Sequence, residues 1–453
     1  MRPPAVRPIR ARSPPIVDAG CAALAKGVGT GLFGEVERAT LSSPESRPVR
    51  RREIFGWCCY DFANSAFTTI IITVVFAPWF MGVIAAGDAR GPGWWGTALA
   101  VSQIVVLMFS PLIGAIADVK AQKKFYLMTM AAVCSAATLL LALAGAGDIW
   151  LALGLVIVAN IAFSLGENLC ASFLPEISTP QNVGRISGYG WSFGYLGGLS
   201  SLVLALLIIN SGPGRVPWTF VMTGVFFLLA CLPTLMLRER ARRRSLAPGE
   251  TWISLGWGQL ATMRRELSQH RTLLIFFVSM LFFMAGLTAV VAFASVFAHD
   301  VLGMTQAEVI KLFIMLQLAG VAGAWGFGIL QDRTGPRLAL AISLLQWVAV
   351  CVWAAVCTTK VEFYCIGVLA GAAMGSLQSG ARAVVAILTP AGRAGEFFGY
   401  WGFFAKLAAV IGQPVFGWMA AYAGYRVAVL ANGVFFLVGL IILLRLRLRT
   451  SAR

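Results

Sequence analysis

Apolar residues along the chain gather into about twelve runs, most of them roughly 20 residues or longer, with short polar stretches between them. A run of this length crosses a ~30 Å hydrocarbon core as an α-helix, because each residue adds ~1.5 Å along the helix axis. The pattern therefore predicts an all-α membrane protein, with transmembrane helices at 54–86, 94–117, 125–146, 149–173, 186–210, 218–237, 272–298, 308–330, 337–357, 362–388, 397–421 and 425–445.

Composition supports this fold class. Of the 453 residues, 58% are hydrophobic and only 12% are charged, and the mean hydropathy is +0.80. A soluble protein of this size needs far more charge to cover its surface. The nine cysteines are scattered without the spacing of a metal site or a disulfide framework, so we expect no metal and no cofactor.

The polar stretches divide the chain into five parts. Residues 1–52 are rich in Pro, Arg and Ser and are predicted to form a disordered basic arm, without the compact apolar core of a signal peptide. Two six-helix bundles are expected at 53–237 and 272–445, joined by a cytoplasmic central loop at 238–271 and followed by a tail at 446–453. Within the loop, TWISLGWGQL is either a short amphipathic helix at the membrane interface or an ordinary loop.

The net charge of +17 comes from loops on one side of the predicted membrane and does not indicate nucleic-acid binding. Lys and Arg concentrate in the arm, the tail and the loops on that side, whereas the opposite loops hold only Arg90, Arg215, Lys311, Lys360 and Arg426. By the positive-inside rule, both termini are cytoplasmic. We expect a multi-pass protein of the bacterial inner (plasma) membrane, surrounded by lipid, monomeric and without a nucleic-acid partner.

The two bundles repeat one another in sequence. GAIADVKAQKK after the second span and GILQDRTGPR after the eighth each contain a glycine, an acid four residues later and then basic residues. GRISGYGWSF at 184–193 likewise matches GEFFGYWGFF at 395–404. Duplicated six-helix halves are typical of secondary transporters, in which the solute binds between the halves near the middle of the membrane.

The glycine-to-aspartate-to-basic loops resemble the signature of the major facilitator superfamily. Resemblance to the bacterial branch of a group related to autophagy-linked vacuolar amino-acid effluxers comes from WCCYDFANSAF, LPEISTPQNVGRISGYGWSFGYLGG and LTPAGRAGEFFGYWGFFAKLAAVIGQP. It covers Glu53 to Arg449 and implies a transporter fold and the efflux of amino acids or similar small solutes. Two positions depart from the pattern: residues 284–286 read Met-Ala-Gly where an acid commonly precedes the glycine, and Gln413 separates a usual Gly-Pro pair.

Acids in short loops can meet basic side chains or a helix N-terminus, and such contacts hold the cytoplasmic face closed until the halves move. The repeated loop motif and the loops after spans 4 and 10 supply suitable side chains. We predict that these residues form a cytoplasmic gate: Asp118, Asp332, Arg333, Glu176, Arg185 and Arg393.

Ionisable residues inside the spans are Asp61, Glu167, Arg382 and Lys406. A charge at a helix centre costs about 2.5–3.5 kcal/mol, so these side chains should face the bundle interior and find partners. The two acids lie in the first half and the two bases lie in the second. An acidic half that faces a basic half would suit a zwitterionic solute.

Glu167 is the strongest candidate for the transport cavity and has two interpretations. Its carboxylate binds an amine, a cation or a proton, or it forms a structural pair with Arg382 or Lys406. The two bases either hold a solute carboxylate or serve in gating or structural pairs. Further polar residues either line the cavity or only link helices: Asn64, Asn168, Gln317 and Gln378.

Two other patterns concern helix faces. Asp61 and Asn64 share one face of the first span. Counted from Phe55, Asp61 lies only about 9 Å into the helix at ~1.5 Å per residue, closer to the cytoplasmic end than to the middle of the membrane. We therefore predict that Asp61 is a cytoplasmic gate carboxylate that pairs with Arg185 or Arg393. Glycines spaced by four residues in spans 5 and 11 are expected to form close helix contacts and not ligand sites: Gly190, Gly194, Gly198, Gly395 and Gly399.

Taken together, the sequence predicts a secondary active transporter that moves a small organic solute by alternating access, with amino-acid efflux favoured. Proton coupling stays open, and the alternative is a non-transporting receptor or scaffold with the same fold. An enzyme is not expected, because the spans contain neither paired histidines nor a Ser-Lys or paired-Asp arrangement. The absence of a GxxxxGK[ST] loop argues against an ATP-driven pump.

Overall fold

A computed structural model describes residues 49–178, 183–240, 267–388 and 394–446, together with single positions between 251 and 265. Most of the predicted basic arm and of the central loop, and the end of the tail, lie outside these described residues. All secondary-structure elements in the described ranges are helical. Among them are 12 helical spans long and apolar enough to cross a membrane, which confirms the predicted fold class.

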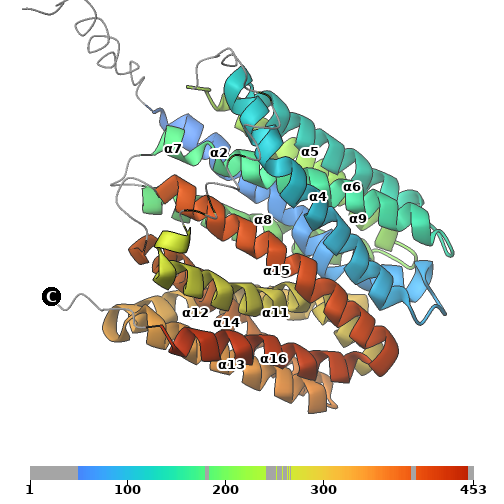
Figure 1. The fold of residues 1–453 in the computed structure, drawn as a ribbon. Helices are drawn as coiled ribbons and strands as arrows, with labels where there is room; N and C mark the ends of the chain where they lie inside the picture. The colour runs from blue at the N-terminus through green and yellow to red at the C-terminus, as the bar shows by residue number, and fades with distance from the viewer. Residues whose placement is uncertain are drawn as a thin grey trace, which may run out of the picture. The chain divides into compact units, whose positions relative to one another are not determined.

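Six of these spans belong to the first half of the chain, drawn in blue to green in Figure 1. The first span combines four segments: α2 Arg51–Phe67, η1 Thr68–Val74, α3 Phe76–Trp79 and η2 Phe80–Ile84. The other elements are α4 Gly91–Lys120, α5 Lys123–Leu140, η3 Leu141–Leu143, α6 Ile149–Ala171, the short α7 Leu174–Ile177, α8 Val183–Asn210, α9 Val216–Ala230 and η4 Leu232–Met236.

The second half, drawn in yellow to red, contributes six spans that are each a single α-helix. These are α11 Arg271–Leu302, α12 Gln306–Thr334, α13 Pro336–Val356, α14 Lys360–Leu388, α15 Ala394–Ala423 and α16 Tyr425–Leu444. In Figure 1 the helices of each half form their own group, and α15 lies along the boundary between the two groups.

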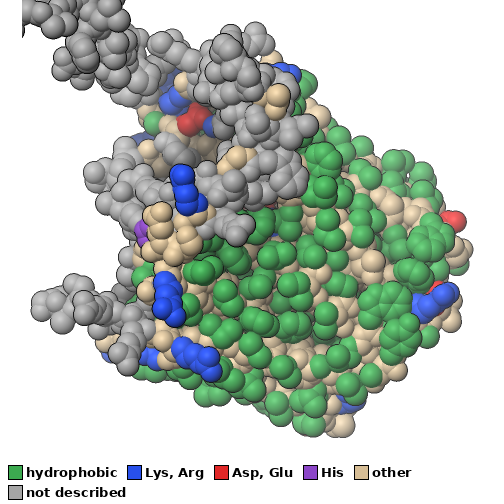
Figure 2. Space-filling view, in the orientation of Figure 1, with side chains coloured by type: hydrophobic (Ala, Val, Ile, Leu, Met, Phe, Trp, Pro, Cys, Tyr) green, Lys and Arg blue, Asp and Glu red, His purple; other side chains and the backbone are tan. Residues whose placement is uncertain are grey.

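The two membrane faces of the protein differ in charge. Most of the Lys and Arg side chains visible in Figure 2 lie along the left edge, the end at which α2 begins, and we call this end the basic face. The other end, where α11 turns into α12 at Gly303, is the opposite face. Between them Figure 2 shows a broad surface of hydrophobic side chains, as expected for a surface in contact with lipid.

The first span is not the single regular helix that the sequence predicts. Its middle segment η1 is a π-helix, so the N–H of Val75 donates to the carbonyl of Ile70, five residues earlier, at 2.9 Å. Pro78 follows, and proline has no N–H to donate to the carbonyl four residues before it, which belongs to Val74. The Val74 carbonyl therefore needs a donor from another helix, because unsatisfied backbone groups are costly in the membrane.

Glycines on α8 allow close contact with α2. An added Cβ at Gly190 would lie 2.5 Å from the carboxylate of Asp61, and one at Gly197 would overlap the carbonyl oxygen of Phe62. Three of the glycines named from the sequence lie on this side of α8: Gly190, Gly194 and Gly198. Gly399 of α15 differs, because an added Cβ there meets no described atom within 4 Å.

Replacing Gly197 with alanine should destabilise the protein, because the new Cβ would collide with a backbone carbonyl that cannot rotate away. Overpacking of this kind typically costs about 1–3 kcal/mol. Gly154 of α6 is a matched control, since an added Cβ there meets nothing described within 4 Å. Thermal unfolding in detergent should show a lower midpoint for Gly197→Ala alone; equal midpoints would contradict this α2–α8 packing.

Candidate functional site

An ion pair joins the two halves of the protein. Lys406 Nζ of α15 lies 2.8 Å from Glu167 Oε2 of α6. The Glu167 side chain is 47% exposed and the Lys406 side chain 19%, so the carboxylate borders open space and not a packed core. Of the two bases considered as partners for Glu167, the structure brings Lys406 to it.

Hydrogen bonds between polar side chains connect α4 and α6 beside this ion pair. They join Ser102 to Asn160 at 2.5 Å, Gln103 to Ser164 at 3.4 Å, and Ser110 to Asn168 at 2.8 Å. The sequence analysis identified only Asn168 among these residues. The signal that could have found the others is the four-residue spacing of Asn160, Ser164 and Asn168, which places all three on one face of α6.

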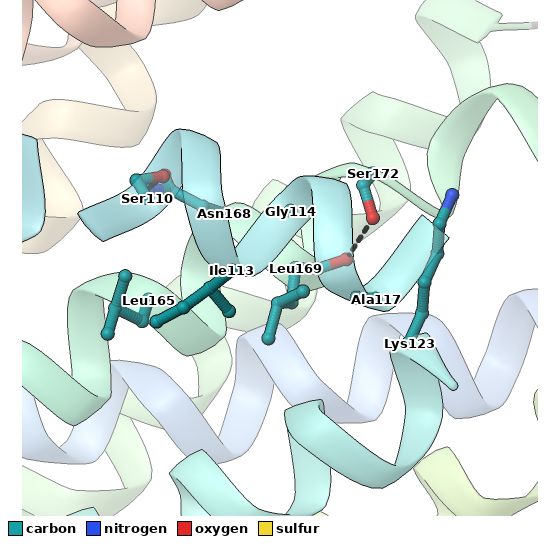
Figure 3. A pocket seen from close by; sticks show the side chains of 9 residues that line it. All are labelled: Ser110, Ile113, Gly114, Ala117, Lys123, Leu165, Asn168, Leu169 and Ser172. Carbon is teal, nitrogen blue, oxygen red and sulfur yellow. Dashed lines mark hydrogen bonds between the residues drawn. The ribbon is translucent and has the colours of Figure 1, made fainter. Parts of the chain in front are cut away.

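A pocket of about 110 Å³, partly open to solvent, lies at the basic-face end of the contact between α4 and α6 (Figure 3). Asn168, predicted for the cavity between the halves, lies in this pocket inside the first half. Its side-chain amide donates a hydrogen bond to the hydroxyl of Ser110 on α4. The pocket is lined by Ser110, Ile113, Gly114, Ala117, Lys123, Leu165, Asn168, Leu169 and Ser172.

A network of charged residues links several elements of the first half at the basic face. Glu176 of α7 accepts from Lys123 Nζ at 2.9 Å and from the backbone N–H of Arg240 at 3.0 Å. The Arg240 guanidinium in turn lies 2.8 Å from Glu53 Oε2, whose side chain is buried. Glu176, predicted as a gate residue, is thus held by Lys123 of its own half and by Arg240 at the start of the central loop, and these two partners were not identified from the sequence.

Several predicted residues lie where α8 contacts α2 of its own half and α12 of the other half. The Asp61 carboxylate lies against Gly190. Asn64 is 6% exposed, and its Oδ1 has no hydrogen-bond partner among the described residues. The Gln317 amide of α12 approaches Gly198 of α8, where an added Cβ would lie 3.2 Å from its oxygen.

The structure also places three further predicted residues. Gln378 is half-buried in α14, and Arg333 is exposed in the last turn of α12. Gly395 is the second residue of α15. Arg393 and the side chains of four further predicted residues lie outside the described part of the chain: Asp118, Arg185, Asp332 and Arg382.

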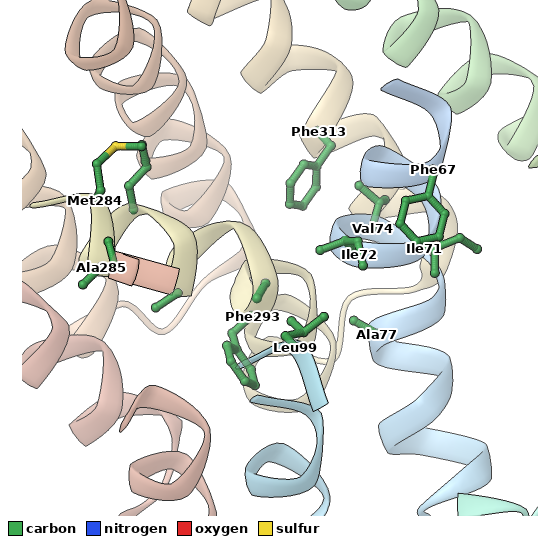
Figure 4. Packing of buried hydrophobic residues seen from close by; sticks show 14 of the residues in the cluster. Phe67, Ile71, Ile72, Val74, Ala77, Leu99, Met284, Ala285, Phe293 and Phe313 are labelled. Carbon is green, nitrogen blue, oxygen red and sulfur yellow. The ribbon is translucent and has the colours of Figure 1, made fainter. Parts of the chain in front are cut away.

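The halves are in contact near the opposite face. In the described ranges, hydrogen bonds between the halves run from Trp418 to Thr97 at 3.0 Å, from Trp95 to the Ala292 carbonyl at 3.3 Å, from Gln306 to the Val74 carbonyl at 2.8 Å, and from Ser295 to the Thr73 carbonyl. Buried apolar side chains of both halves belong to the same layer, including Val74, Leu99, Phe293 and Phe313 (Figure 4).

Glycines of α4 and α15 that lie toward the basic face have space beside them. Added Cβ atoms at Gly114 of α4 and at Gly399 and Gly402 of α15 would meet no described atom within 4 Å. At the other end of these two helices, a Cβ at Gly96 would overlap the Gln413 carbonyl. In the described part of the protein, the hydrogen bonds between the halves therefore gather toward the opposite face, whereas the glycines nearer the basic face have space beside them and the Glu167 carboxylate is about half exposed.

The sequence profile of the family described as "Vacuole effluxer Atg22 like" matches residues 97–453. The chain belongs to this family. One relative of this Atg22-like protein is the "Uncharacterized MFS-type transporter YxiO" of Bacillus subtilis (strain 168). The two are 23% identical over 401 residues, which cover 86% of this chain and 93% of the relative.

Autophagy-related protein 22 of Yarrowia lipolytica (strain CLIB 122 / E 150) is a more partial match. It is 23% identical over 296 residues, which cover 58% of this Atg22-like chain and 50% of the fungal protein. The alignment thus spans half the length of that fungal relative.

Solved transporter structures share the fold at low sequence identity. The nucleoside transporter NupG has a TM-score of 0.64 at 16% identity, covering 87% of this chain and 98% of that chain. A D-xylose-proton symporter has a TM-score of 0.65 at 13% identity, covering 88% and 97%. The Atg22-like protein therefore has the major facilitator fold. As predicted, it is a multi-pass membrane transporter and not an enzyme.

The contact between Gln306 and Val74 in this Atg22-like transporter follows from the irregular first span. Pro78 cannot donate to the Val74 carbonyl, and the next N–H along the chain, that of Trp79, donates to Val75 at 3.2 Å. Gln306, the first residue of α12, supplies the donor from the other half at 2.8 Å. A proline in one half thus creates the acceptor that holds the other half at the opposite face.

Gln306→Leu should favour opening at the opposite face about 2- to 10-fold, because a net hydrogen bond contributes about 0.5–1.5 kcal/mol. A cysteine in place of the buried Ala98 of α4 reports opening through its labelling rate with a membrane-impermeant maleimide applied from that face. Gln346→Leu, which removes a glutamine bond within the second half, is the control.

In a Pro78→Ala background the effect of Gln306→Leu should shrink, because residue 78 then supplies its own N–H to Val74. Additive effects of the two substitutions would contradict the assigned role of the proline.

Proposed function

We propose that the protein exports a small zwitterionic solute, such as an amino acid, from the bacterial cytoplasm by alternating access. In this proposal the basic face and both termini are cytoplasmic, the membrane is the plasma membrane, and the transporter acts as a monomer. The single observation that carries the proposal is the ion pair between Glu167 and Lys406, which connects the halves at 2.8 Å and leaves the Glu167 side chain about half exposed.

The charges of this pair suit a zwitterion. A solute ammonium group binds Glu167 in place of the lysine, and the solute carboxylate binds Lys406 in place of the glutamate. Each protein charge then keeps a partner inside the membrane, where an unpaired charge is costly. The exchange is also accessible, because the Glu167 side chain is about half exposed.

Loading of the site would also loosen the connection between the halves. The pair holds α15 to α6, and a bound solute replaces that direct contact with two contacts of its own. The halves then rock, the opposite face opens and the solute leaves, as in other transporters built from two repeats. The family description "Vacuole effluxer Atg22 like" supports the direction of efflux.

Proton exchange at Glu167 is the favoured coupling mechanism. When the opposite face is open and the solute has left, a proton takes the place of the solute ammonium group on the Glu167 carboxylate. The proton is released to the cytoplasm after the halves return. Export would thus be driven by proton entry.

The test is transport of a panel of amino acids and other small solutes by the purified protein in liposomes, with and without an imposed pH gradient. Glu167→Gln should lower the rate of amino-acid export at least about tenfold, since a factor of ten corresponds to only ~1.4 kcal/mol. It should also abolish the response to the gradient. Asp88→Asn, which breaks an exposed ion pair with Arg90 within one half, is the control and should transport normally.

A double variant separates a binding role from a purely structural pair. Glu167→Gln with Lys406→Gln removes both charges together and leaves no unpaired charge. Normal transport by this variant would overturn the proposal that the pair binds the solute. If the wild type moves no solute in the panel while a soluble protein binds its central loop or basic arm, the receptor or scaffold alternative is supported.

A further inference from the structure

A buried glutamine beside the ion pair has an unused acceptor. Gln103 of α4 is only 7% exposed, and its Nε2 lies 3.4 Å from Ser164 Oγ of α6. Its Oε1 has no hydrogen-bond partner among the described residues. A buried acceptor without a partner costs about 1–3 kcal/mol, so this oxygen is suited to a donor that arrives with a ligand.

Two features of the fold place Gln103 next to the ion pair. Ser164 precedes Glu167 by three residues on α6, so the two side chains lie on neighbouring positions of one helix face. The contacts of α4 with α15 give a second, independent placement. Glycines set the antiparallel register of these helices, with Gly96 against Gln413. Seven residues later on α4 and seven residues earlier on α15, this register brings Gln103 level with Lys406.

Gln103 also lies on the basic-face side of the contacts that join the halves near the opposite face. It is about 18 Å along α4 from Gly91 at the opposite face, at ~1.5 Å per residue, and the contacts between the halves lie on that side of it. A solute that enters from the basic face and reaches the ion pair therefore meets Gln103 at the inner end of its path.

We propose that Gln103 is a specificity residue that accepts a hydrogen bond from the solute ammonium group and so selects primary amines. The inference rests on the proposed binding of a zwitterion to Glu167 and Lys406. A primary ammonium has three N–H donors, one for Glu167 and one for Gln103 Oε1. A trimethylated ammonium has the same charge and no donor, so it satisfies Glu167 electrostatically but leaves Gln103 unpaired.

Ser164 acts as the positioning residue in this arrangement. Its hydroxyl accepts from the Gln103 Nε2 at 3.4 Å and so leaves the Oε1 as the unpaired end of the amide. Packing of α4 on α6 does not depend on this bond alone, because the Ser102–Asn160 and Ser110–Asn168 bonds flank it at 2.5 and 2.8 Å. Removing the amide should therefore alter recognition with little effect on the fold.

The experiment compares L-alanine and L-leucine with their N,N,N-trimethyl forms as transported solutes in liposomes. In Gln103→Leu the KM for the primary amines should rise about 10- to 100-fold, the range expected for a hydrogen bond to a charged group. The KM for the trimethyl forms should change less than about twofold, and kcat should change little for either class.

Further variants keep the test decisive. Gln103→Met, which is closer in shape, should give the same loss of discrimination if Gln103→Leu folds poorly. Ser164→Ala should raise the KM for primary amines less than Gln103→Leu does, and the double variant should resemble Gln103→Leu. The control is Gln346→Leu, which removes a glutamine that bonds the Leu369 carbonyl at 3.0 Å within the second half.

The outcomes distinguish this inference from the proposed function. An equal rise in KM for primary and trimethylated amines, or no rise for either, would overturn the role of Gln103 while transport that depends on Glu167 still stands. If the wild type transports neither amino acid, and Glu167→Gln changes the transport of no solute, both the proposed function and this inference fail.

Discussion

Within a bilayer there is no water to satisfy polar groups, so every carbonyl, amide and charge inside the hydrocarbon needs a partner from the protein. Many features of this structure follow from that constraint. Pro78 leaves the Val74 carbonyl without its helical donor, and Gln306 of the other half supplies one at 2.8 Å. Glu167 and Lys406, one from each half, neutralise each other in the same way. Partners that come from the opposite half make the satisfaction of polar groups depend on how the halves are arranged.

The two kinds of contact between the halves differ in what can replace them. Near the opposite face, the partners are backbone carbonyls and indole or amide groups, packed among buried apolar residues such as Leu99 and Phe293. At the ion pair, the partners are full charges beside open space. In the proposed mechanism, a charged solute competes with the second kind and not with the first. Alternation between the two faces then follows, because a contact that the solute can replace lies beside contacts that it cannot replace.

The departures from the resembled family pattern have a structural setting. Ala285, which stands where an acid commonly precedes the glycine, is buried, and an added Cβ at Gly412 of α15 would overlap its carbonyl. A carboxylate at this position would be desolvated against the backbone of α15. Among the described residues, an ion pair between the halves is instead formed by α6 and α15.

What the sequence determined by itself is whatever depends on local pattern. Runs of apolar residues gave the twelve spans, because the thickness of the bilayer sets their length, and the repeated loops indicated two halves. The cost of a buried charge identified Glu167 and Lys406 individually. Tertiary structure decided which residues meet: Lys406 as the partner of Glu167, Lys123 and Arg240 as the partners of Glu176, and Ser110 as that of Asn168. These choices depend on helix register and on the spacing between helices far apart in the sequence, which no single span encodes.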